Sequence, residues 1–366
     1  MKVRLGDLTL IKTGKLDANA SSPDGEYPFF TCSKDPLKIS TYSYDCECVL
    51  VAGNGDLNVK YYKGKFDAYQ RTYIIEGNGD GRLHIPYLYY FLYGYVEELR
   101  RLSIGGVIKY IKLGNLTEAM IELPTIQKQK EIVRILEKAI GLLYARQEQL
   151  RTLDTLIKAR FVEMFGTYPV NEKGWTTGTI RDLVTEVRYG SSRKAAEGDS
   201  GKYPYLRMNN ITYGGELDLT DTKTIDVPEE ELDKCTVHRG DLLFNRTNSK
   251  ELVGKTCVYN REEMMVLAGF VVRVRLNEKA LPEFVSAFMN TDFSKQMLLG
   301  MCKAAIGQAN INAQELQNIG IYIPPLEAQK SFALFKAKVD KSKIVIQQAL
   351  DKTKQLFESL MQKYFS

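Results

Sequence analysis

The chain contains few of the residues from which catalytic and metal sites are built. Its 366 residues include two histidines, His84 and His238, in unrelated contexts. It has no Gly-x-x-x-x-Gly-Lys-Ser/Thr phosphate loop, and no cofactor-cradling glycine turn follows a clear strand. The segment Ile323-Pro324-Pro325-Leu326 lacks the polar first residue and the aromatic residue with which amino-methyltransferases hold a flipped base. We therefore expect this chain to carry no active site, cofactor or metal.

Membrane and export signals are also missing. No uninterrupted apolar run of about 18 residues occurs, and residues 1–7 form no apolar signal core, so we expect a cytoplasmic protein without a membrane span. Cys46-Glu47-Cys48 places one residue between the two sulfurs, whereas zinc knuckles use two. The six scattered cysteines are therefore expected to be buried free thiols. The net charge of +5 permits nucleic-acid binding but does not demonstrate it.

What the sequence does contain is a repeat. Residues 116–166 align without a gap with residues 316–366, an offset of 200. The identical pairs include Leu116/Leu316, Ile121/Ile321, Pro124/Pro324, Gln129/Gln329, Lys130/Lys330, Leu150/Leu350, Leu156/Leu356 and Phe165/Phe365. Each copy consists of a short apolar strand, a proline break and one long helix. Such a chain can fold with pseudo-twofold symmetry, which suits a two-part partner.

The segments between the helices repeat as well. Leu5-Gly6-Asp7-Leu8 corresponds to Ile180-Arg181-Asp182-Leu183, Tyr27-Pro28-Phe29 to Tyr203-Pro204-Tyr205, and residues 50–54 to 243–247. The resulting prediction is an α+β chain with two mixed α/β globular units and two long antiparallel helices. The expected domains are 1–124, 125–166, 167–324 and 325–366. A shared framework with different loops suggests that one fold recognises two different ligands.

Each long helix carries an apolar stripe typical of a coiled coil. In the first helix, expected from Thr125, the stripe comprises Ile132, Leu136, Ala139, Leu143, Arg146, Leu150, Leu153, Ile157, Arg160 and Met164. In the second helix it comprises Phe332, Phe335, Val339, Ile346, Ala349, Leu356 and Leu360. Neither helix can bury its stripe alone, so the two are expected to pair.

Polar side chains gather in loops at expected strand ends. Arginine, asparagine and glutamine make bidentate contacts with purine edges, and serine, threonine and lysine suit phosphates. In the second globular unit the candidate DNA-binding residues are Arg188, Ser191, Arg193, Lys194, Arg207, Asn209, Asn210, Asn245, Arg246, Thr247, Lys250, Gln308 and Asn310. In the first unit they are Asn54, Lys60, Tyr61, Lys63 and Arg71, where tyrosines alternate with bases.

At this point the chain resembles the specificity subunits of type I restriction–modification systems over its whole length. Residues 321–329 fit the pattern Ile-x-x-Pro-Pro-Leu-x-x-Gln at the start of a helical region, and in residues 121–129 Thr125 replaces the second proline. Gly174-Trp175 followed by Ile180-Arg181-Asp182-Leu183 resembles the start of a recognition domain. Gly307-Gln308-Ala309-Asn310-Ile311 resembles a DNA-contacting loop, from which residues 105–111 depart.

The resemblance implies a non-catalytic subunit in which each globular unit binds one half of a bipartite, asymmetric double-stranded DNA target. It also implies two modification subunits, which bind S-adenosylmethionine and dock on the helices, and up to two restriction subunits, which use ATP and Mg²⁺. Two alternatives remain. One is a self-contained enzyme such as a methyltransferase or nuclease, and the other is a coiled-coil scaffold with two heads that do not bind DNA.

Overall fold

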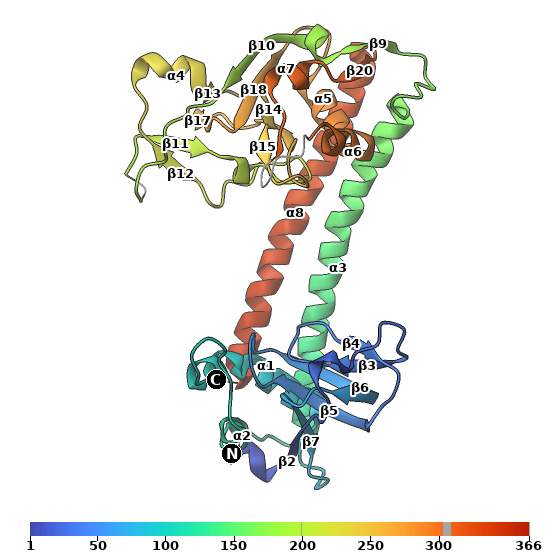
Figure 1. Ribbon diagram of the computed structural model, residues 1–366, viewed down its shortest axis with the longest axis vertical. Coiled ribbons are helices and arrows are strands. Elements are labelled where there is room, and N and C mark those ends of the chain that lie inside the picture. Colours follow the sequence, from blue (N-terminus) through green and yellow to red (C-terminus); the bar gives the residue numbers. More distant parts are fainter. Residues whose placement is uncertain (199, 303–308, 366) are drawn as a thin grey trace. The chain divides into compact units, whose positions relative to one another are not determined.

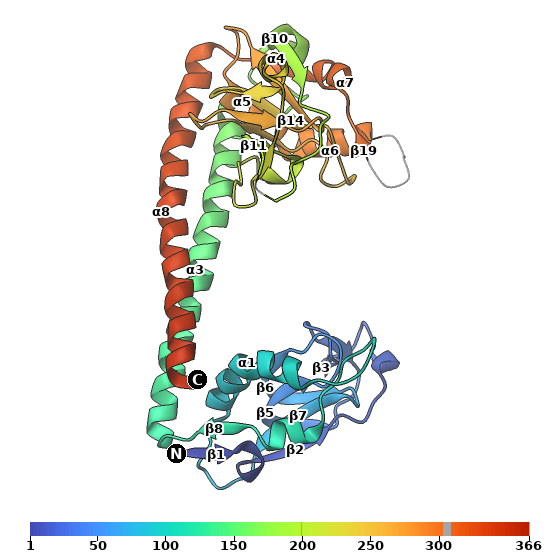
Figure 2. The same ribbon diagram turned by 90° about the vertical axis from the view of Figure 1, so that its left-hand side faces the viewer.

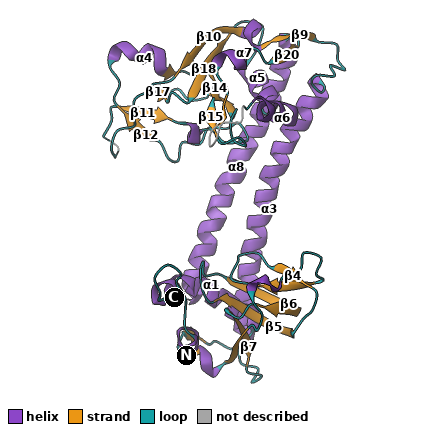
Figure 3. Ribbon diagram, in the orientation of Figure 1, coloured by secondary structure: helices purple, strands orange, loops and turns teal. Residues whose placement is uncertain are grey.

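The computed structural model describes residues 1–198, 200–302 and 309–365, and the chain divides into two compact units. Unit 1 contains residues 1–147 together with the segment from residue 347 onward, and unit 2 contains residues 148–346. Each unit combines strands, short helices and parts of two long helices (Figures 1 and 3). The α+β class expected from the repeat is therefore confirmed.

Unit 1 is built on a six-stranded sheet with the order β2-β7-β5-β6-β3-β4, accompanied by the antiparallel pair β1-β8. Helix α1 packs on β5 and β6 (Figure 2), and its inward face contains Leu88, Phe91, Leu92 and Leu99. The strands are β1 (Lys2–Arg4), β2 (Thr9–Thr13), β3 (Tyr27–Phe30), β4 (Leu37–Ile39), β5 (Tyr44–Ala52), β6 (Val59–Ala68), β7 (Thr72–Gly77) and β8 (Met120–Glu122). The helices are η1 (Leu5–Asp7), η2 (Ala18–Ala20), α1 (Ile85–Leu102), α2 (Leu113–Thr117) and the long α3 (Ile126–Phe165).

Unit 2 contains two four-stranded sheets, β10-β18-β14-β16 and β12-β11-β17-β13, and the pairs β15-β19 and β20-β9. Its strands are β9 (Thr176–Thr179), β10 (Val184–Tyr189), β11 (Tyr203–Leu206), β12 (Lys223–Ile225), β13 (Thr236–Val237), β14 (Leu242–Asn245), β15 (Thr247–Asn248), β16 (Thr256–Val258), β17 (Met265–Leu267), β18 (Val271–Leu276), β19 (Ala309–Asn310) and β20 (Gly320–Ile323). Its helices are η3 (Ile180–Leu183), η4 (Met208–Asn210), α4 (Glu229–Cys235), α5 (Pro282–Met289), α6 (Asp292–Met301), α7 (Ala313–Gln317) and the long α8 (Leu326–Phe365).

The repeat seen in the sequence extends to individual hydrogen bonds. The first strand of each unit pairs antiparallel with the strand before the long helix, β1 with β8 and β9 with β20. The backbone N–H of Leu5 donates to the carbonyl of Ala119 at 2.8 Å, and that of Ile180 donates to Ile319 at 2.9 Å. Two different sequences thus adopt the same framework, as the paired motifs predicted.

The units differ in how they form the centre of the sheet. In unit 1 the ten-residue strand β6 pairs antiparallel with β5 along most of its length and parallel with β3 at its end. In unit 2 these two pairings belong to separate strands, because β16 pairs with β14 and β17 pairs with β11. The interruption between β16 and β17 explains why one sheet in unit 1 corresponds to two in unit 2.

The apolar stripe expected on the first long helix is confirmed by burial. Between residues 141 and 160 of α3, the side chains shielded from solvent are Leu143, Arg146, Leu150, Leu153, Ile157 and Arg160, all of which belong to the expected stripe. In unit 2, the Phe161 ring packs edge-on against Phe332 of α8 at 5.3 Å between centroids, and Lys343 pairs with Asp154. Positions further along α3 meet earlier positions of α8, so the two segments run antiparallel.

One member of the second stripe was predicted wrongly. Leu356 is 53% exposed, and its neighbour Phe357 packs instead against the core of unit 1. The shielded positions of α8 follow a 4-3 spacing through Lys336, Lys343, Leu350, Thr353 and Phe357, which are the equivalents of the α3 stripe after the offset of 200. Selecting apolar residues alone missed this spacing, because three of its positions in α8 are polar.

Among residues 1–198, 200–302 and 309–365, no helix is long and apolar enough to cross a membrane.

Candidate nucleic-acid interface

The candidate surface begins where the second strand of each unit ends. Gly14 follows β2 and Gly190 follows β10, and a Cβ atom at these positions would lie 2.1 Å from the Ala68 carbonyl oxygen and 2.3 Å from that of Leu267, respectively. These distances are too short for any side chain, so glycine is required where the chain crosses the end of β6 or β17. The crossing brings the loops that follow Thr13 and Tyr189 onto the same edge of the sheet.

One further loop is joined at this edge to the tip of a tight turn by a matching backbone hydrogen bond in each unit. The N–H of Gly53, after β5, donates to the carbonyl of Arg71 at 2.8 Å. In unit 2 the N–H of Arg246, after β14, donates to the carbonyl of Phe270 at 3.0 Å. The residues 53 and 246 are therefore structurally equivalent, as the sequence alignment of 50–54 with 243–247 predicted.

The loop before the final strand docks onto these same residues. The carbonyl of Gly53 accepts a hydrogen bond from Ile111 N–H, and the carbonyl of Arg246 accepts one from Ile311 N–H, both at 2.9 Å. Alongside, Asn54 forms a β-bridge with Tyr110, and Thr247 pairs with Asn310. Residues 110 and 111 of unit 1 thus take the positions of residues 310 and 311 of unit 2, although the sequence of 105–111 departs from that of the Asn310 loop.

The loop after the third strand is tied down by a side chain in each unit. Asn58 Nδ2 donates to the carbonyl of Cys32 at 2.8 Å, and Lys255 Nζ donates to the carbonyl of Met208 at 2.8 Å. Burial lowers the pKa of Lys255. Each unit therefore gathers four loops from distant parts of the sequence at one edge, joined by hydrogen bonds.

In unit 2 several exposed or half-buried side chains of this edge are in contact. The guanidinium of Arg246 lies over the Tyr189 ring, 4.8 Å from its centroid, and Arg246 Nε donates to Asn310 Oδ1 at 3.2 Å. The Tyr189 hydroxyl accepts from the Ala313 N–H at 3.0 Å. Stacking and hydrogen bonding hold the arginine side chain in place, which is the preorganisation that base recognition requires.

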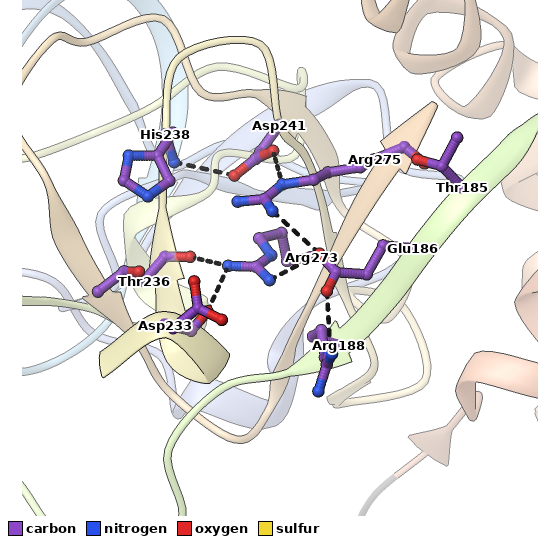
Figure 4. Close-up of polar contacts among 9 residues, drawn as sticks. All are labelled: Thr185, Glu186, Arg188, Asp233, Thr236, His238, Asp241, Arg273 and Arg275. Carbon is purple, nitrogen blue, oxygen red and sulfur yellow. Dashed lines mark hydrogen bonds and ion pairs between the residues drawn. The ribbon is translucent and has the colours of Figure 1, made fainter. Parts of the chain in front are cut away.

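Arg188, next to Tyr189, belongs to a charged network (Figure 4). Arg188, Arg273 and Arg275 surround Glu186, with N–O distances of 2.8, 2.9 and 3.1 Å. Arg275 also contacts Asp241 at 3.0 Å, and Arg273 donates to the Thr236 carbonyl. Although burial opposes ionisation, the three arginines hold the pKa of Glu186 below its usual range. The charge of Arg188 is thus partly neutralised by Glu186 within the unit.

The remaining candidates of unit 2 that are not buried fall into two groups. Arg193 pairs with Glu231 at 2.7 Å, and Arg207 pairs with Asp221 at 2.9 Å, so both guanidinium groups have an internal partner. Lys194, Asn209 and Lys250 are exposed. Any contact that Arg193 or Arg207 makes with DNA would have to compete with its carboxylate.

Four other candidates of unit 2 are buried. Asn210 uses its side chain within the loop, donating to the carbonyls of Asp218 and Asp221, while Asn245 is fully buried. Ser191 and Thr247 are 7% and 8% exposed. These residues shape the loops rather than presenting polar groups to solvent. Gln308 lies outside the described residues.

The candidates of unit 1 lie on β6 and in the neighbouring loops. Tyr61 donates to Glu47 Oε1 at 2.7 Å, and Lys63 lies 3.4 Å from Glu47 Oε2. Lys60 donates to the Asn58 side chain, and burial lowers its pKa. Arg71 is exposed, and among the described residues no carboxylate pairs with its guanidinium. Arg71 and Asn54 therefore lie at the four-loop edge, whereas Tyr61 and Lys63 lie along the strand.

Comparison with known proteins identifies the family. The model of the type I restriction modification DNA specificity domain matches residues 1–152 and 172–354. The chain belongs to this family. It is 37% identical over 169 residues to the EcoDI type I restriction enzyme specificity subunit of Escherichia coli, covering 46% of this chain and 37% of that protein. It is 25% identical over 291 residues to the EcoKI specificity subunit of E. coli K12, covering 74% and 62%. The matches thus span less than two thirds of either relative.

Solved structures support the fold of this specificity-domain protein. The S subunit of a type I restriction–modification system from M. genitalium superimposes with a TM-score of 0.61 at 14% identity, covering 100% of this chain and 96% of that one. A structure describing complex assembly and conformational transition of the type I system gives 0.61 at 15% identity, covering 100% and 97%. At these identities the likeness establishes the fold.

Sequence reasoning missed three exposed residues at the edges of these specificity domains. Phe270 is 53% exposed in the turn between β17 and β18. Val107 is fully exposed and Ile108 is 62% exposed in the loop that docks beside Asn54. A search confined to polar side chains could not find them, although an apolar side chain in a polar loop is a visible signal.

All six cysteines are free thiols. Cys48, Cys235, Cys257 and Cys302 are buried, as expected, whereas Cys32 and Cys46 are only half-buried. Within the described part of the chain, no group of three or more histidine, cysteine, aspartate or glutamate side chains is arranged to hold a metal ion.

Proposed function

We propose that this chain is the non-catalytic DNA-specificity subunit of a type I restriction–modification complex. Each unit would read one half of a bipartite, asymmetric double-stranded DNA target. The observation that carries the proposal is the four-loop edge, which the chain builds twice on the same backbone hydrogen bonds with different exposed side chains. Family membership and the names of the relatives support it.

The side chains at equivalent positions explain why the two half-sites would differ. Position 246 of unit 2 carries arginine where unit 1 has Gly53, and position 310 carries asparagine where unit 1 has Tyr110. Arginine suits guanine and asparagine suits adenine, whereas tyrosine offers a stacking face and one hydroxyl. The same fold would therefore recognise two unrelated half-sites, giving an asymmetric target.

The long helices would set the spacer between the half-sites and bind the partner subunits. Leu156 and Leu356 are identical in the two repeats and remain 45% and 53% exposed, outside the apolar stripes. A side chain that is repeated and apolar but not used in the helix pair suits two copies of one partner. We assign these leucines to the docking surface for two modification subunits, with up to two restriction subunits joining the complex in the cytoplasm. S-adenosylmethionine, ATP and Mg²⁺ would bind to those partners.

Methylation-site sequencing tests the proposal. DNA from cells that carry this gene with genes for a modification subunit should show adenine methylation at one bipartite motif, and deletion of this gene should abolish it. Unchanged methylation after deletion would contradict the proposal. Binding of S-adenosylmethionine by the isolated chain would favour a self-contained enzyme. An assembled complex with no preference for any DNA sequence would favour a scaffold whose heads do not bind DNA.

A further inference from the structure

Arg71 and Phe270 occupy the same position in the two units. Strand β5 pairs with β7 through Ala52 and Thr72, and β14 pairs with β18 through Asn245 and Val271. One residue beyond each pair, the Arg71 carbonyl accepts from Gly53 and the Phe270 carbonyl accepts from Arg246. The equivalence rests on strand register, because the two side chains have nothing in common.

The backbone around this position is fixed in both units. The N–H of Thr72 donates to the Tyr69 carbonyl, and the N–H of Val271 donates to the Ala268 carbonyl, both at 2.8 Å. The neighbouring residues 69 and 268 lie next to the loop crossings at Leu16 and Ser191. Position 71/270 is thus the tip of a tight turn held at the centre of the four-loop edge.

Both side chains are available to a ligand. Arg71 is exposed and lacks a carboxylate partner within the described ranges, in contrast to the paired Arg193 and Arg207. The Phe270 ring is 53% exposed. Its immediate neighbour Arg246 already stacks on Tyr189. An exposed phenyl ring between polar loops adds nothing to a core, and its position is the one at which unit 1 presents a guanidinium.

We infer that position 71/270 is a specificity-determining position of both units. Arg71 donates to the N7 and O6 acceptors of a guanine in the half-site of unit 1, and Phe270 contacts the 5-methyl group of a thymine in the half-site of unit 2. These assignments follow from the major-groove pattern of each base, in which guanine presents two acceptors and thymine an apolar methyl. The inference rests on the proposed function.

The neighbouring position supports this division. In unit 2 the guanidinium comes from residue 246 and the apolar group from residue 270, whereas in unit 1 residue 53 is glycine and the guanidinium comes from residue 71. When the two units are compared, Arg246 and Arg71 therefore lie at the ends of strands that are neighbours in the shared framework. Neighbouring strands of a sheet lie about 4.8 Å apart. Each unit has one guanidinium at these two positions, and its place in unit 1 differs by one strand from its place in unit 2.

The Phe270 assignment is tested by removing single methyl groups from the DNA. The assembled complex is measured on its own target and on targets with deoxyuridine in place of thymine, one position at a time. At one position in the half-site of unit 2, deoxyuridine in place of thymine should weaken wild-type binding about fourfold, which corresponds to the burial of one methyl group. Phe270→Ala should bind thymine and deoxyuridine equally at that position, while Phe270→Leu should keep part of the difference.

Controls separate this effect from folding and from the wider proposal. Tyr213→Ala removes an aromatic side chain of similar exposure, 51%, from the same unit and should keep the thymine preference. The melting temperature of each variant shows that it folds. A half-site of unit 2 without thymine, or a Phe270→Ala complex that still discriminates deoxyuridine, would overturn the assignment. A wild-type complex without sequence preference would instead refute the proposed function.

The Arg71 assignment has a parallel test in the other half-site. Replacing one guanine by 7-deazaguanine removes the N7 acceptor and should weaken wild-type binding about tenfold at a single position, as expected for one hydrogen bond of a bidentate pair. Arg71→Ala should abolish that sensitivity and leave the thymine effect in the other half-site intact. Retained sensitivity to 7-deazaguanine, or a half-site without guanine, would exclude Arg71 from base recognition.

Discussion

Gln129 and Gln329, 200 residues apart, make the same three side-chain hydrogen bonds. Gln129 Oε1 accepts from the His84 N–H at 2.8 Å, and Nε2 donates to the carbonyls of Arg82 and Pro124 at 2.8 and 2.9 Å. Gln329 Oε1 accepts from the Leu281 N–H at 2.8 Å, and Nε2 donates to Lys279 and Pro324 at 3.0 and 2.8 Å. Both glutamines are fully buried. They join the start of each long helix to the start of the helix that covers the neighbouring sheet.

Replacing either glutamine by leucine should destabilise the unit that contains it. Leucine leaves a buried N–H and two carbonyls without partners, at a cost of about 1–3 kcal/mol for each unsatisfied group. Thermal unfolding measures the effect, and Gln127→Leu on the exposed side of α3 is the matched control. Equal stability of Gln129→Leu and Gln127→Leu would mean that the three bonds do not contribute.

Glu186 should make the stability of unit 2 depend on pH. Its folded pKa lies below the usual value of a glutamate, about 4.3, because three arginines outweigh the effect of burial. The stabilisation is present above the unfolded pKa and is lost as the pH falls through the lower folded value. At neutral pH, Glu186→Gln should cost about 3 kcal/mol, since Arg273 is 2% exposed and loses its charged partner.

Denaturant unfolding at several pH values checks this prediction. The difference between wild type and Glu186→Gln should shrink as the pH falls below about 4.3. Glu262→Gln, which removes the exposed partner of Arg239, should change stability by less than about 1 kcal/mol at any pH. A difference that stays constant down to strongly acidic pH would contradict the role given to Glu186.

Two leucines of α3 should respond differently to the same substitution. Leu153 is shielded in the helix stripe, whereas Leu156 is 45% exposed. Leu153→Asp buries a charge and should cost about 2 kcal/mol or more, while Leu156→Asp should change stability by about 0.5 kcal/mol. If Leu153→Asp has the same melting temperature as the wild type, the paired-helix stripe does not stabilise unit 2. Pull-down of modification subunits is the second readout, in which Leu156→Asp should lose binding.

Arg246 and Lys250 should affect DNA binding in different ways. Arg246→Ala should weaken binding to the cognate target by about 1–3 kcal/mol and relax one base position, because a bidentate base contact is lost. Lys250→Ala should weaken all sequences alike and reduce the dependence on salt, as expected for a phosphate contact. Competition assays with randomised half-sites measure both effects. Equal losses on cognate and random DNA for Arg246→Ala would remove it from the base-reading residues.

The length of the helices should set the preferred spacer. Seven residues inserted after Leu143 and seven at the matching level of α8 keep the stripe in register, because they add one heptad to each helix. At 1.5 Å per residue and 3.4 Å per base pair, the preferred gap should grow by about three base pairs. Methylation-site sequencing of cells with the inserted protein gives the gap directly. An active protein with the original gap would show that the helices do not measure the spacer.

The sequence predicted the framework well, for a physical reason. The helix stripe in α3 and the paired motifs depend on local period and turn chemistry, which a single sequence displays. The stripe of α8 was predicted less well, because Lys343 lies at a shielded position through ion pairs with Asp154 and Glu216. Those partners are far away in sequence, so hydrophobicity alone does not reveal the shielded position. Without that position the 4-3 spacing was not seen, and Leu356 was assigned to the stripe in place of Phe357.

The candidate interface was predictable only in its general composition. Local sequence shows that residues 188–194 and 245–250 are polar loops, but it does not show that Arg193 is paired with Glu231 or that Asn245 is buried. Whether a polar side chain is available depends on partners elsewhere in the sequence, 38 residues away for Arg193 and 14 residues away for Arg207. The equivalence of Arg71 with Phe270 depends on strand register, which no similarity between the two residues reveals.

The composition of unit 1 has a consequence for biosynthesis. Its buried core is packed against by four partly buried side chains of the second long helix, Phe357, Leu360, Met361 and Phe365. Unit 2, in contrast, is continuous in sequence from residue 148 to 346. Chains emerge from the ribosome from the N-terminus, and domains generally fold as units. All of unit 2 is therefore synthesised before the helical segment that unit 1 receives after residue 346, so unit 1, although begun first, is the last to obtain all of its packing partners.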